Sequence, residues 1–242
     1  MDLVSEQTWI KHLYYGIQMQ KLWVLAILAL AGCGNKEQPA KTSSAGPPVP
    51  PPAAPGPARD GRPPIVVFGD SISAGFGLDG GQSFPDLLQQ DLDRRGLKYR
   101  IVNLGVSGDT TQDGIARLSM AVNEKPAIAL IELGGNDGLR GIPIRITQQN
   151  LASMIEAFQN AGVRVVLAGM TLPPNYGPTY IRQFEAVYRD VAKKYKVTLI
   201  PFLLDGVGGH SDLMQRDGLH PNAEGARKVE ALVMKTLEPM LK

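Results

Sequence analysis

Five short apolar runs, separated by longer stretches with helical periodicity, constrain the fold of this chain more than any other feature. The runs cover residues 65–68, 99–104, 128–133, 163–168 and 198–203. Because they are mainly apolar rather than strictly alternating, they are typical of strands buried on both faces. One stretch near the carboxyl end has the three-to-four spacing of a buried helix face, at Ala226, Val229, Val233 and Leu237. Five strand–helix units predict an α/β fold, a three-layer α/β/α domain with a five-stranded parallel sheet in flavodoxin-like order.

Unusual polar clusters follow these predicted strands. They are GDS at 69–71, SG at 107–108, GGND at 134–137 and, before the last helix, DGLH at 217–220. In open parallel sheets, ligands bind beyond the carboxyl ends of the strands, where the strand order reverses. The clusters are therefore expected to meet at one edge of the sheet and to form one site.

A serine, a histidine and an aspartate in these clusters can form a catalytic triad. A serine hydroxyl needs a base within hydrogen-bond reach, and imidazole titrates near neutral pH, so His220 is the candidate base for Ser71. Asp217 precedes His220 by three residues. On a helical turn the two share a face, so the carboxylate can hold one ring nitrogen while the other faces the serine. The predicted oxyanion donors are the backbone N–H groups of Ser71 and Gly108 and the side-chain amide of Asn136.

Each of these residues also has a simpler structural interpretation. Ser71 could be an ordinary turn serine, and His220 could be a histidine without a role at a helix start. A rival base, His210, has no aspartate three residues upstream. Asp70 and Asp137 are predicted to stabilise their turns rather than to act in catalysis. The matched histidine and the two donor clusters favour the catalytic interpretation of the serine.

Composition argues against several other classes of protein. The net charge of +2 is too small to indicate a nucleic-acid partner. One cysteine cannot form an internal disulfide, and three histidines without a zinc-site pattern argue against a metal enzyme, with a carboxylate site as the alternative that stays open. Gly75, Gly77 and Gly80 match G-x-G-x-x-G, but this match begins several residues after the strand, so no nucleotide cofactor is expected. No feature indicates an obligate protein partner.

Four segments together resemble the conserved blocks of the GDSL/SGNH hydrolase family. They are GDSIS, GVSGDTT, GGND and DGLH, and they occur in the family's order between residue 65 and the carboxyl end. The resemblance implies the SGNH hydrolase fold and an ester hydrolase that works through an acyl-enzyme. It also implies site residues: the four residues of the family name are Ser71, Gly108, Asn136 and His220, and Asp217 completes the triad.

Longer segments resemble one subgroup of the family. VNLGVSGDTTQDGIARL, ELGGNDGLRG and LPPNYG are similar to segments of its multifunctional acyl-CoA thioesterases, arylesterases and lysophospholipases. LPPNYG follows the fourth predicted strand at the same edge, and its apolar, proline-stiffened character predicts a substrate-binding wall for an acyl chain. This wall comprises Leu172, Pro173, Pro174, Asn175, Tyr176 and Gly177. Fatty acyl esters, lysophospholipids and thioesters are the expected small-molecule substrates.

Two other functions remain open. Other members of the family remove acetyl groups from carbohydrate or peptidoglycan, so an O-acetyl esterase is the alternative enzyme. A non-catalytic lipoprotein that carries a lipid in the same pocket is the alternative from another class of protein. The serine–histidine pair argues against this carrier, because binding alone does not need it.

The first 32 residues are predicted to be a signal peptide. Lys21 precedes an apolar run at 22–31, which has the length of a signal-peptide core. The run leads into Gly32-Cys33, and Leu30 to Cys33 resembles a bacterial lipobox, which implies cleavage before Cys33 and lipidation of its thiol. A short buried helix with a chance cysteine is the alternative. Residues 1–18 carry no targeting signal and are consistent with an artefact of an upstream start codon.

The segment after the predicted cleavage site has the composition of a tether. Residues 33–64 are rich in proline and alanine, cannot bury a core and favour extended conformations. The hydrolase domain is predicted to cover 65–242. Gly34, rather than an aspartate, follows the cysteine, which by the same resemblance implies the outer membrane. The expected location is therefore the bacterial periplasm, with the domain tethered to the outer membrane through Cys33.

Overall fold

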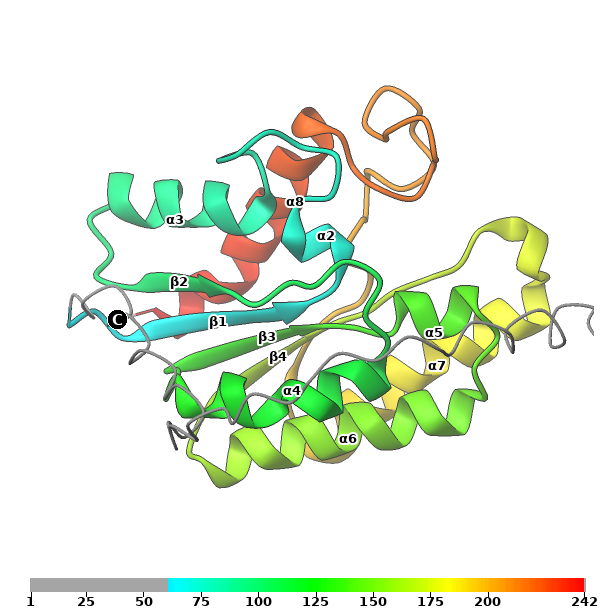
Figure 1. Ribbon diagram of the computed structural model, residues 1–242, viewed down its shortest axis with the longest axis horizontal. Helices are drawn as coiled ribbons and strands as arrows, with labels where there is room; N and C mark the ends of the chain where they lie inside the picture. Colours follow the sequence, from blue (N-terminus) through cyan, green and yellow to red (C-terminus); the bar gives the residue numbers. More distant parts are fainter. Residues whose placement is uncertain (1–60, 242) are drawn as a thin grey trace, which may run out of the picture. The chain divides into compact units, whose positions relative to one another are not determined.

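The computed structural model describes residues 61–241 of the 242-residue chain (Figure 1). The predicted signal peptide, the lipidation site Cys33 and nearly all of the predicted tether lie outside the described residues. None of the helices within residues 61–241 combines the length and the apolar character needed to cross a membrane.

Five parallel strands form one sheet in the order β2-β1-β3-β4-β5, which confirms the predicted α/β class and the flavodoxin-like order. The strands are β1 (Pro64–Gly69), β2 (Arg100–Asn103), β3 (Ile128–Glu132), β4 (Arg164–Ala168) and β5 (Thr198–Ile200). β3 is buried along its whole length, and β1 at every position after its first. These central strands carry the core, so their sequences are apolar without alternation.

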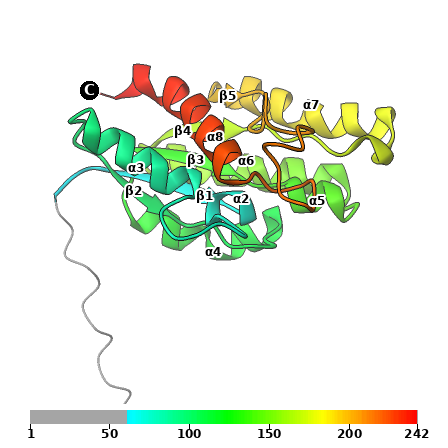
Figure 2. The same cartoon turned by 90° about the horizontal axis from the view of Figure 1, so that it is seen from above.

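Helices cover both faces of the sheet (Figures 1 and 2). One layer consists of α3 (Phe84–Arg94) and α8 (Ala223–Leu237), and the other of α4 (Thr111–Asn123), α6 (Ile144–Asn160) and α7 (Pro178–Tyr195). Shorter elements are α2 (Ser71–Ala74), α5 (Gly135–Leu139), η1 (Pro174–Tyr176) and η2 (Glu238–Met240). The four positions predicted to form the buried face of the last helix are all buried. Because α2 and α5 directly follow β1 and β3, their first turns lie at the carboxyl edge of the sheet.

Three predicted boundaries need correction. β5 ends at Ile200 rather than at residue 203, because Pro201 has no N–H to donate to a strand ladder. β1 begins at Pro64, inside the predicted tether range, because the Pro64 carbonyl already accepts the N–H of Ala127 at 2.8 Å. Residues 217–220 form turns and bends rather than a helical turn, and α8 begins only at Ala223.

Candidate active site

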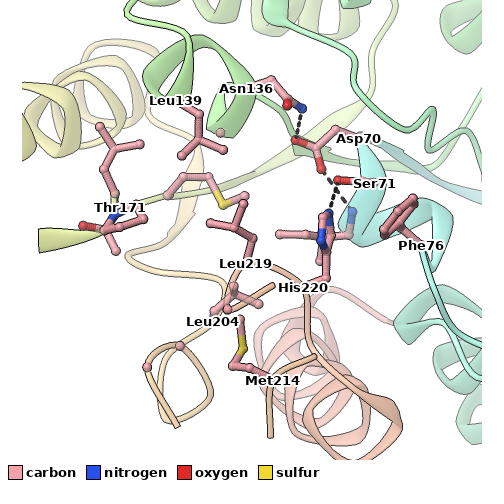
Figure 3. Close-up of a pocket in the computed structure, with 18 of the residues that line it drawn as sticks. Asp70, Ser71, Phe76, Asn136, Leu139, Thr171, Leu204, Met214, Leu219 and His220 are labelled. Atoms are coloured by element: carbon pink, nitrogen blue, oxygen red, sulfur yellow. Dashed lines mark hydrogen bonds between the residues drawn. The ribbon is translucent and has the colours of Figure 1, made fainter. Parts of the chain in front are cut away.

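The predicted polar clusters meet at the carboxyl edge of the sheet. A cavity of about 520 Å³ lies there, and its lining includes Ser71, Gly108, Asn136 and His220 (Figure 3). These four residues come from four segments that are far apart in the sequence. Parallel strands with all their carboxyl ends at one edge bring such segments together.

Ser71 is the first residue of α2, immediately after β1. Asp70 is the N-cap of this short helix, and its Oδ1 accepts the N–H of Ile72 at 3.1 Å. This contact agrees with the structural role predicted for Asp70, although its second oxygen also contacts Asn136. The tight turn presents the Ser71 hydroxyl to the cavity.

His220 and Asp217 extend a hydrogen-bonded chain from this hydroxyl. The Nε2 atom of His220 lies 2.8 Å from Ser71 Oγ (Figure 3). The Nδ1 atom of the same ring lies 2.6 Å from Asp217 Oδ2. The order serine, imidazole, carboxylate is that of a triad in which the acid fixes the ring and its tautomer. His210, the rival base, is exposed and does not line the cavity.

Asp217 reaches the imidazole from an irregular turn. Its Oδ1 accepts the N–H groups of Leu219 at 2.9 Å and His220 at 3.1 Å, and Gly218 between them has a φ of +67°. The side chain thus closes its own turn, as Asp commonly does. Partial burial alone would raise the pKa of Asp217, but the hydrogen bonds from the His220 ring and these two N–H groups outweigh it. They hold this pKa below its ordinary value, so Asp217 is ionised at neutral pH.

Two further groups in the cavity lining can donate to an oxyanion. Gly108 has a φ of +88°, a conformation that favours glycine, and its carbonyl accepts a hydrogen bond from Arg140 at 2.8 Å. The Asn136 Nδ2 atom donates to the Asp109 carbonyl at 2.9 Å and to Asp70 Oδ2 at 3.2 Å. Both N–H groups of the Asn136 amide therefore already have acceptors. To bind an oxyanion, the amide must share or give up the longer of these hydrogen bonds, the one to Asp70.

Asp137, next to Asn136, has the structural role that was predicted for it. The side chain is completely buried, its Oδ2 accepts the N–H of Thr111 at 2.8 Å, and its Oδ1 accepts the hydroxyl of Thr147 at 3.2 Å. These bonds join the start of α5 to α4 and α6, which fixes the segment that carries the amide of Asn136.

Part of the predicted acyl wall lies in the cavity. Leu172, Pro173 and Pro174 line it, whereas Asn175, Tyr176 and Gly177 are not among the lining residues. Tyr176 instead donates its hydroxyl to the Leu139 carbonyl at 2.8 Å. It therefore supports Leu139, which does line the cavity.

Sequence reasoning missed most of the apolar lining. The missed side chains are Phe76, Leu139, Met170, Phe202, Leu204, Met214 and Leu219. Most of them lie in loops, where no periodicity points to a shared face. Phe76 is 51% exposed, and its ring lies against that of His220, with centroids 4.7 Å apart (Figure 3).

Sequence reasoning also missed Arg117, a half-buried residue that connects the loops around the site. Its guanidinium group donates to Asp109 Oδ2 at 2.6 Å, to the Leu104 carbonyl at 2.7 Å and to the Gly69 carbonyl at 2.8 Å. A planar group with several fixed donors suits such multiple contacts. Arg117 lies within the amphipathic pattern of α4, where a surface arginine would look the same.

No cluster of His, Cys, Asp and Glu side chains within residues 61–241 could hold a metal ion. The chemistry available from the described residues is that of a serine activated by an imidazole beside an apolar cavity with several N–H donors.

Comparisons with known proteins agree with this arrangement. Residues 67–228 match the model of the GDSL-like lipase/acylhydrolase family. Esterase TesA of Pseudomonas aeruginosa (strain PAO1) is 49% identical over 178 residues, which are 73% of this chain and 89% of that protein. Thioesterase 1/protease 1/lysophospholipase L1 of Escherichia coli (strain K12) is 36% identical, over 73% of this chain and 84% of that protein.

A solved structure gives the same result at the level of the fold. AlinE4, described as an SGNH-hydrolase family esterase, superposes with a TM-score of 0.62 at 40% identity, over 75% of this chain and 97% of that chain. The similarity thus covers the sheet and all four polar clusters. The chain belongs to the GDSL-like lipase/acylhydrolase family.

Proposed function

We propose that this protein is a serine ester hydrolase that cleaves acyl esters through an acyl-enzyme intermediate. The observation that carries the proposal is the chain of contacts from Ser71 Oγ to His220 Nε2, and from His220 Nδ1 to Asp217, at 2.8 and 2.6 Å. This chain lies in an apolar cavity beside two further N–H donors. Nucleophile, base and orienting acid are within reach of one another, as nucleophilic catalysis requires.

The proposed mechanism moves one proton through His220. Ser71 Oγ attacks the acyl carbonyl carbon while His220 Nε2 accepts the hydroxyl proton, and Asp217 stabilises the imidazolium. The N–H groups of Ser71 and Gly108 and the amide of Asn136 stabilise the negative oxygen of the tetrahedral intermediate. When that intermediate collapses, His220 donates the proton to the leaving alcohol or thiol. A water molecule, deprotonated by His220, then releases the carboxylic acid and restores the serine.

The cavity supports acyl esters with an aliphatic chain as substrates. Its walls are mainly apolar and include Met170 and Leu172, and Leu139 lies on the side away from His220 (Figure 3). A cavity of about 520 Å³ has far more room than an acetyl group needs, so it favours longer acyl chains over the O-acetyl esterase alternative. We therefore propose fatty acyl esters, thioesters and lysophospholipids as the substrate class, in keeping with the names of the relatives.

A reactive-serine probe tests the enzyme against the non-catalytic carrier. A fluorophosphonate is expected to label the wild-type protein and to leave Ser71→Ala unlabelled. Wild-type protein that resists labelling while it still binds a lipid would support the carrier.

Chain-length profiling with p-nitrophenyl esters tests the substrate class. Hydrolysis is expected to continue beyond hexanoate, because the apolar walls gain contacts with each added methylene. A preference for acetate with no activity beyond hexanoate would support the O-acetyl esterase.

We also propose that the protein is an exported lipoprotein of the periplasm, held at the outer membrane through Cys33. The proposal is supported by the signal-like run at 22–31 and the lipobox-like residues that end in Cys33. The intact mass of the protein from a membrane fraction tests it. A mass that begins at Cys33 with an added diacylglyceryl group is expected, and an unprocessed chain would contradict the proposal.

A further inference from the structure

Glu132, at the carboxyl end of β3, is a buried acid that the mechanism above does not use. It has no exposed surface (0%), and it lies opposite Gly69 in the register between β3 and β1. Burying a carboxyl group is costly unless it is hydrogen-bonded. Its contacts therefore indicate what it does in the folded protein.

One carboxyl oxygen of Glu132 accepts hydrogen bonds from the turn that carries the proposed nucleophile. Its Oε2 accepts the N–H of Asp70 at 3.1 Å, the N–H of Ser73 at 3.2 Å and the hydroxyl of Ser73 at 2.5 Å. These donors precede and follow Ser71 in the chain. The carboxyl group thus fixes the backbone on both sides of that serine.

The space for this carboxyl group comes from Gly69. A Cβ atom at this position would lie 2.3 Å from Glu132 Oε2 and 2.2 Å from Ser73 Oγ, far closer than non-bonded atoms approach. A larger residue would therefore displace either the acid or the serine hydroxyl. The glycine of the GDS segment and the acid of the neighbouring strand form one packing unit.

Glu132 also reaches the oxyanion donors through Asp70. The second carboxyl oxygen of Glu132, Oε1, is buried and has no hydrogen-bond partner among the described residues, so a negative charge on this group would be poorly compensated. Burial, and then the charge of Asp70, raise the pKa of Glu132 well above its ordinary value, which favours its protonated form. Burial raises the pKa of Asp70 to about 6, which leaves Asp70 ionised above that pH, and its Oδ2 then accepts the Asn136 amide at 3.2 Å.

Among the described residues, the groups around Glu132 and Asp70 include no positively charged side chain that pairs with Glu132. The titratable and charged groups that face the pair are Asp109, Arg117, Tyr188 and His220. Arg117 is already paired with Asp109 at 2.6 Å, and no cation among the described residues forms an ion pair with Glu132. An ionised Glu132 would thus be a buried, unpaired charge, which proteins avoid.

We propose that Glu132 is a positioning residue of this active site: it holds the turn that carries Ser71, and it orients Asp70, which holds the amide of Asn136. It acts as a carboxylic acid rather than a carboxylate and accepts from Asp70 and Ser73 at one oxygen. The inference deepens the proposed function and rests on it, because it requires Ser71 to be the nucleophile.

Two substitutions at position 132 test this role. Glu132→Gln keeps a neutral side chain with an acceptor oxygen for the Asp70 N–H and for Ser73, and it is expected to retain kcat within about threefold of wild type. Glu132→Ala removes both contacts. It is expected to lower kcat for a short p-nitrophenyl ester on the order of 10- to 100-fold and to leave KM within about twofold. Labelling of Ser71 by a fluorophosphonate should slow by the same factor as kcat.

A destabilised variant remote from the cavity provides the matched control. Leu92 on α3 is completely buried and does not line the cavity, so Leu92→Ala should lower Tm without lowering kcat below that temperature. A kcat for Glu132→Ala as high as that of Leu92→Ala would overturn the proposal. A Glu132→Gln variant as impaired as Glu132→Ala would overturn it too, because the site would then need the charge.

A replacement variant and a labelling comparison ensure that the test decides for or against the proposal. If Glu132→Ala does not fold, Ser73→Ala replaces it, because it removes the 2.5 Å donor to Oε2. A folded Ser73→Ala with a 3- to 10-fold lower kcat is roughly what a lost positioning bond predicts, and a wild-type kcat would overturn the proposal. Wild-type protein that is not labelled at Ser71 would overturn the proposed function itself, whereas equal labelling of wild type and Glu132→Ala would overturn only this inference.

Discussion

At the scale of single residues, the amide of Asn136 is the one proposed oxyanion donor that is not fixed by the backbone. Asn136→Ala is expected to lower kcat on the order of 100- to 1000-fold, as for other oxyanion donors, because the negative charge develops only in the transition state. KM should change by less than about threefold, since the ground state makes little use of this donor. Steady-state kinetics on p-nitrophenyl esters measure both values.

Asn160→Ala is the control for this prediction, because Asn160 is the exposed last residue of α6. It should keep the wild-type kcat. Equal loss of kcat in both variants, or a loss confined to KM in Asn136→Ala, would contradict the donor role.

The buried acid Glu132 predicts a pH dependence of stability. Its pKa is raised in the folded state, so the folded protein keeps a proton that the unfolded chain releases above its ordinary pKa. Stability from this group is therefore fully present below that ordinary pKa and is lost as pH rises. Glu132→Gln removes this loss. Its free energy of unfolding relative to wild type is expected to increase from about pH 4 to about pH 8, measured by urea denaturation.

The residue Asp70 contributes a pH dependence of its own, with a folded-state pKa of about 6, but it is present in both proteins of this comparison. A difference between wild type and Glu132→Gln that stays constant with pH would show that Glu132 is not protonated in the folded state.

Single residues also show where sequence reasoning reached its limit. Ser71, Asp217 and His220 could be predicted because their residue types are reactive and each follows or precedes a recognisable element. Glu132 could not be predicted, because one acid at the end of an apolar run looks like the end of a strand. Its role depends on Gly69 in the neighbouring strand, a pairing that only the register reveals.

At the scale of elements, an aromatic ladder joins α7 to the segment that carries Asn136. The ladder consists of Tyr176, Tyr180, Phe184 and Tyr188, which recur every four residues, and neighbouring rings lie 5.5–6.5 Å apart. The hydroxyl of Tyr188 donates to the Leu133 carbonyl at 3.1 Å, just before α5. The ladder therefore holds α5 in place as well as packing α7.

Tyr188→Phe tests the hydrogen bond by which this ladder holds the segment that carries Asn136. The change leaves the Leu133 carbonyl without its buried donor, so the free energy of unfolding is expected to fall by about 1–2 kcal/mol. Urea denaturation measures it. Tyr195→Phe is the matched control, because the Tyr195 hydroxyl bonds Glu156 at the exposed surface, and it should change stability by less than about 0.5 kcal/mol. Equal effects of the two variants would contradict a special role of the ladder.

The elements predicted most accurately are those whose sequence pattern is set by burial alone. β1 and β3 are almost entirely buried, so their apolar sequences identify them directly. β5 was predicted too long, because the apolar residues after Pro201 lie in a loop and its turns, from which they pack against the core without joining the sheet. The Asp217–His220 pair was correctly joined but assigned to the wrong conformation, since a three-residue spacing suits both a helical turn and an Asp-closed turn.

At the scale of the whole molecule, the described domain contains every predicted site residue except Cys33. The earliest of these in the chain is Ser71, and the domain builds its own core around the sheet. A protein that lacks residues 1–60 is therefore expected to keep kcat/KM within about twofold of the longer chain on soluble esters. Purification of both forms and parallel kinetics test this. A truncated protein that folds but loses activity would show that the preceding residues take part in catalysis.

Both ends of the described chain lie on the side of the domain remote from the reaction. β1 starts at the amino edge of the sheet, and α8 returns there, where the Met240 carbonyl accepts a bond from Arg164 at the start of β4 (Figure 1). A fluorophore, a resin or a second domain can therefore be attached at either end without blocking access to the cavity.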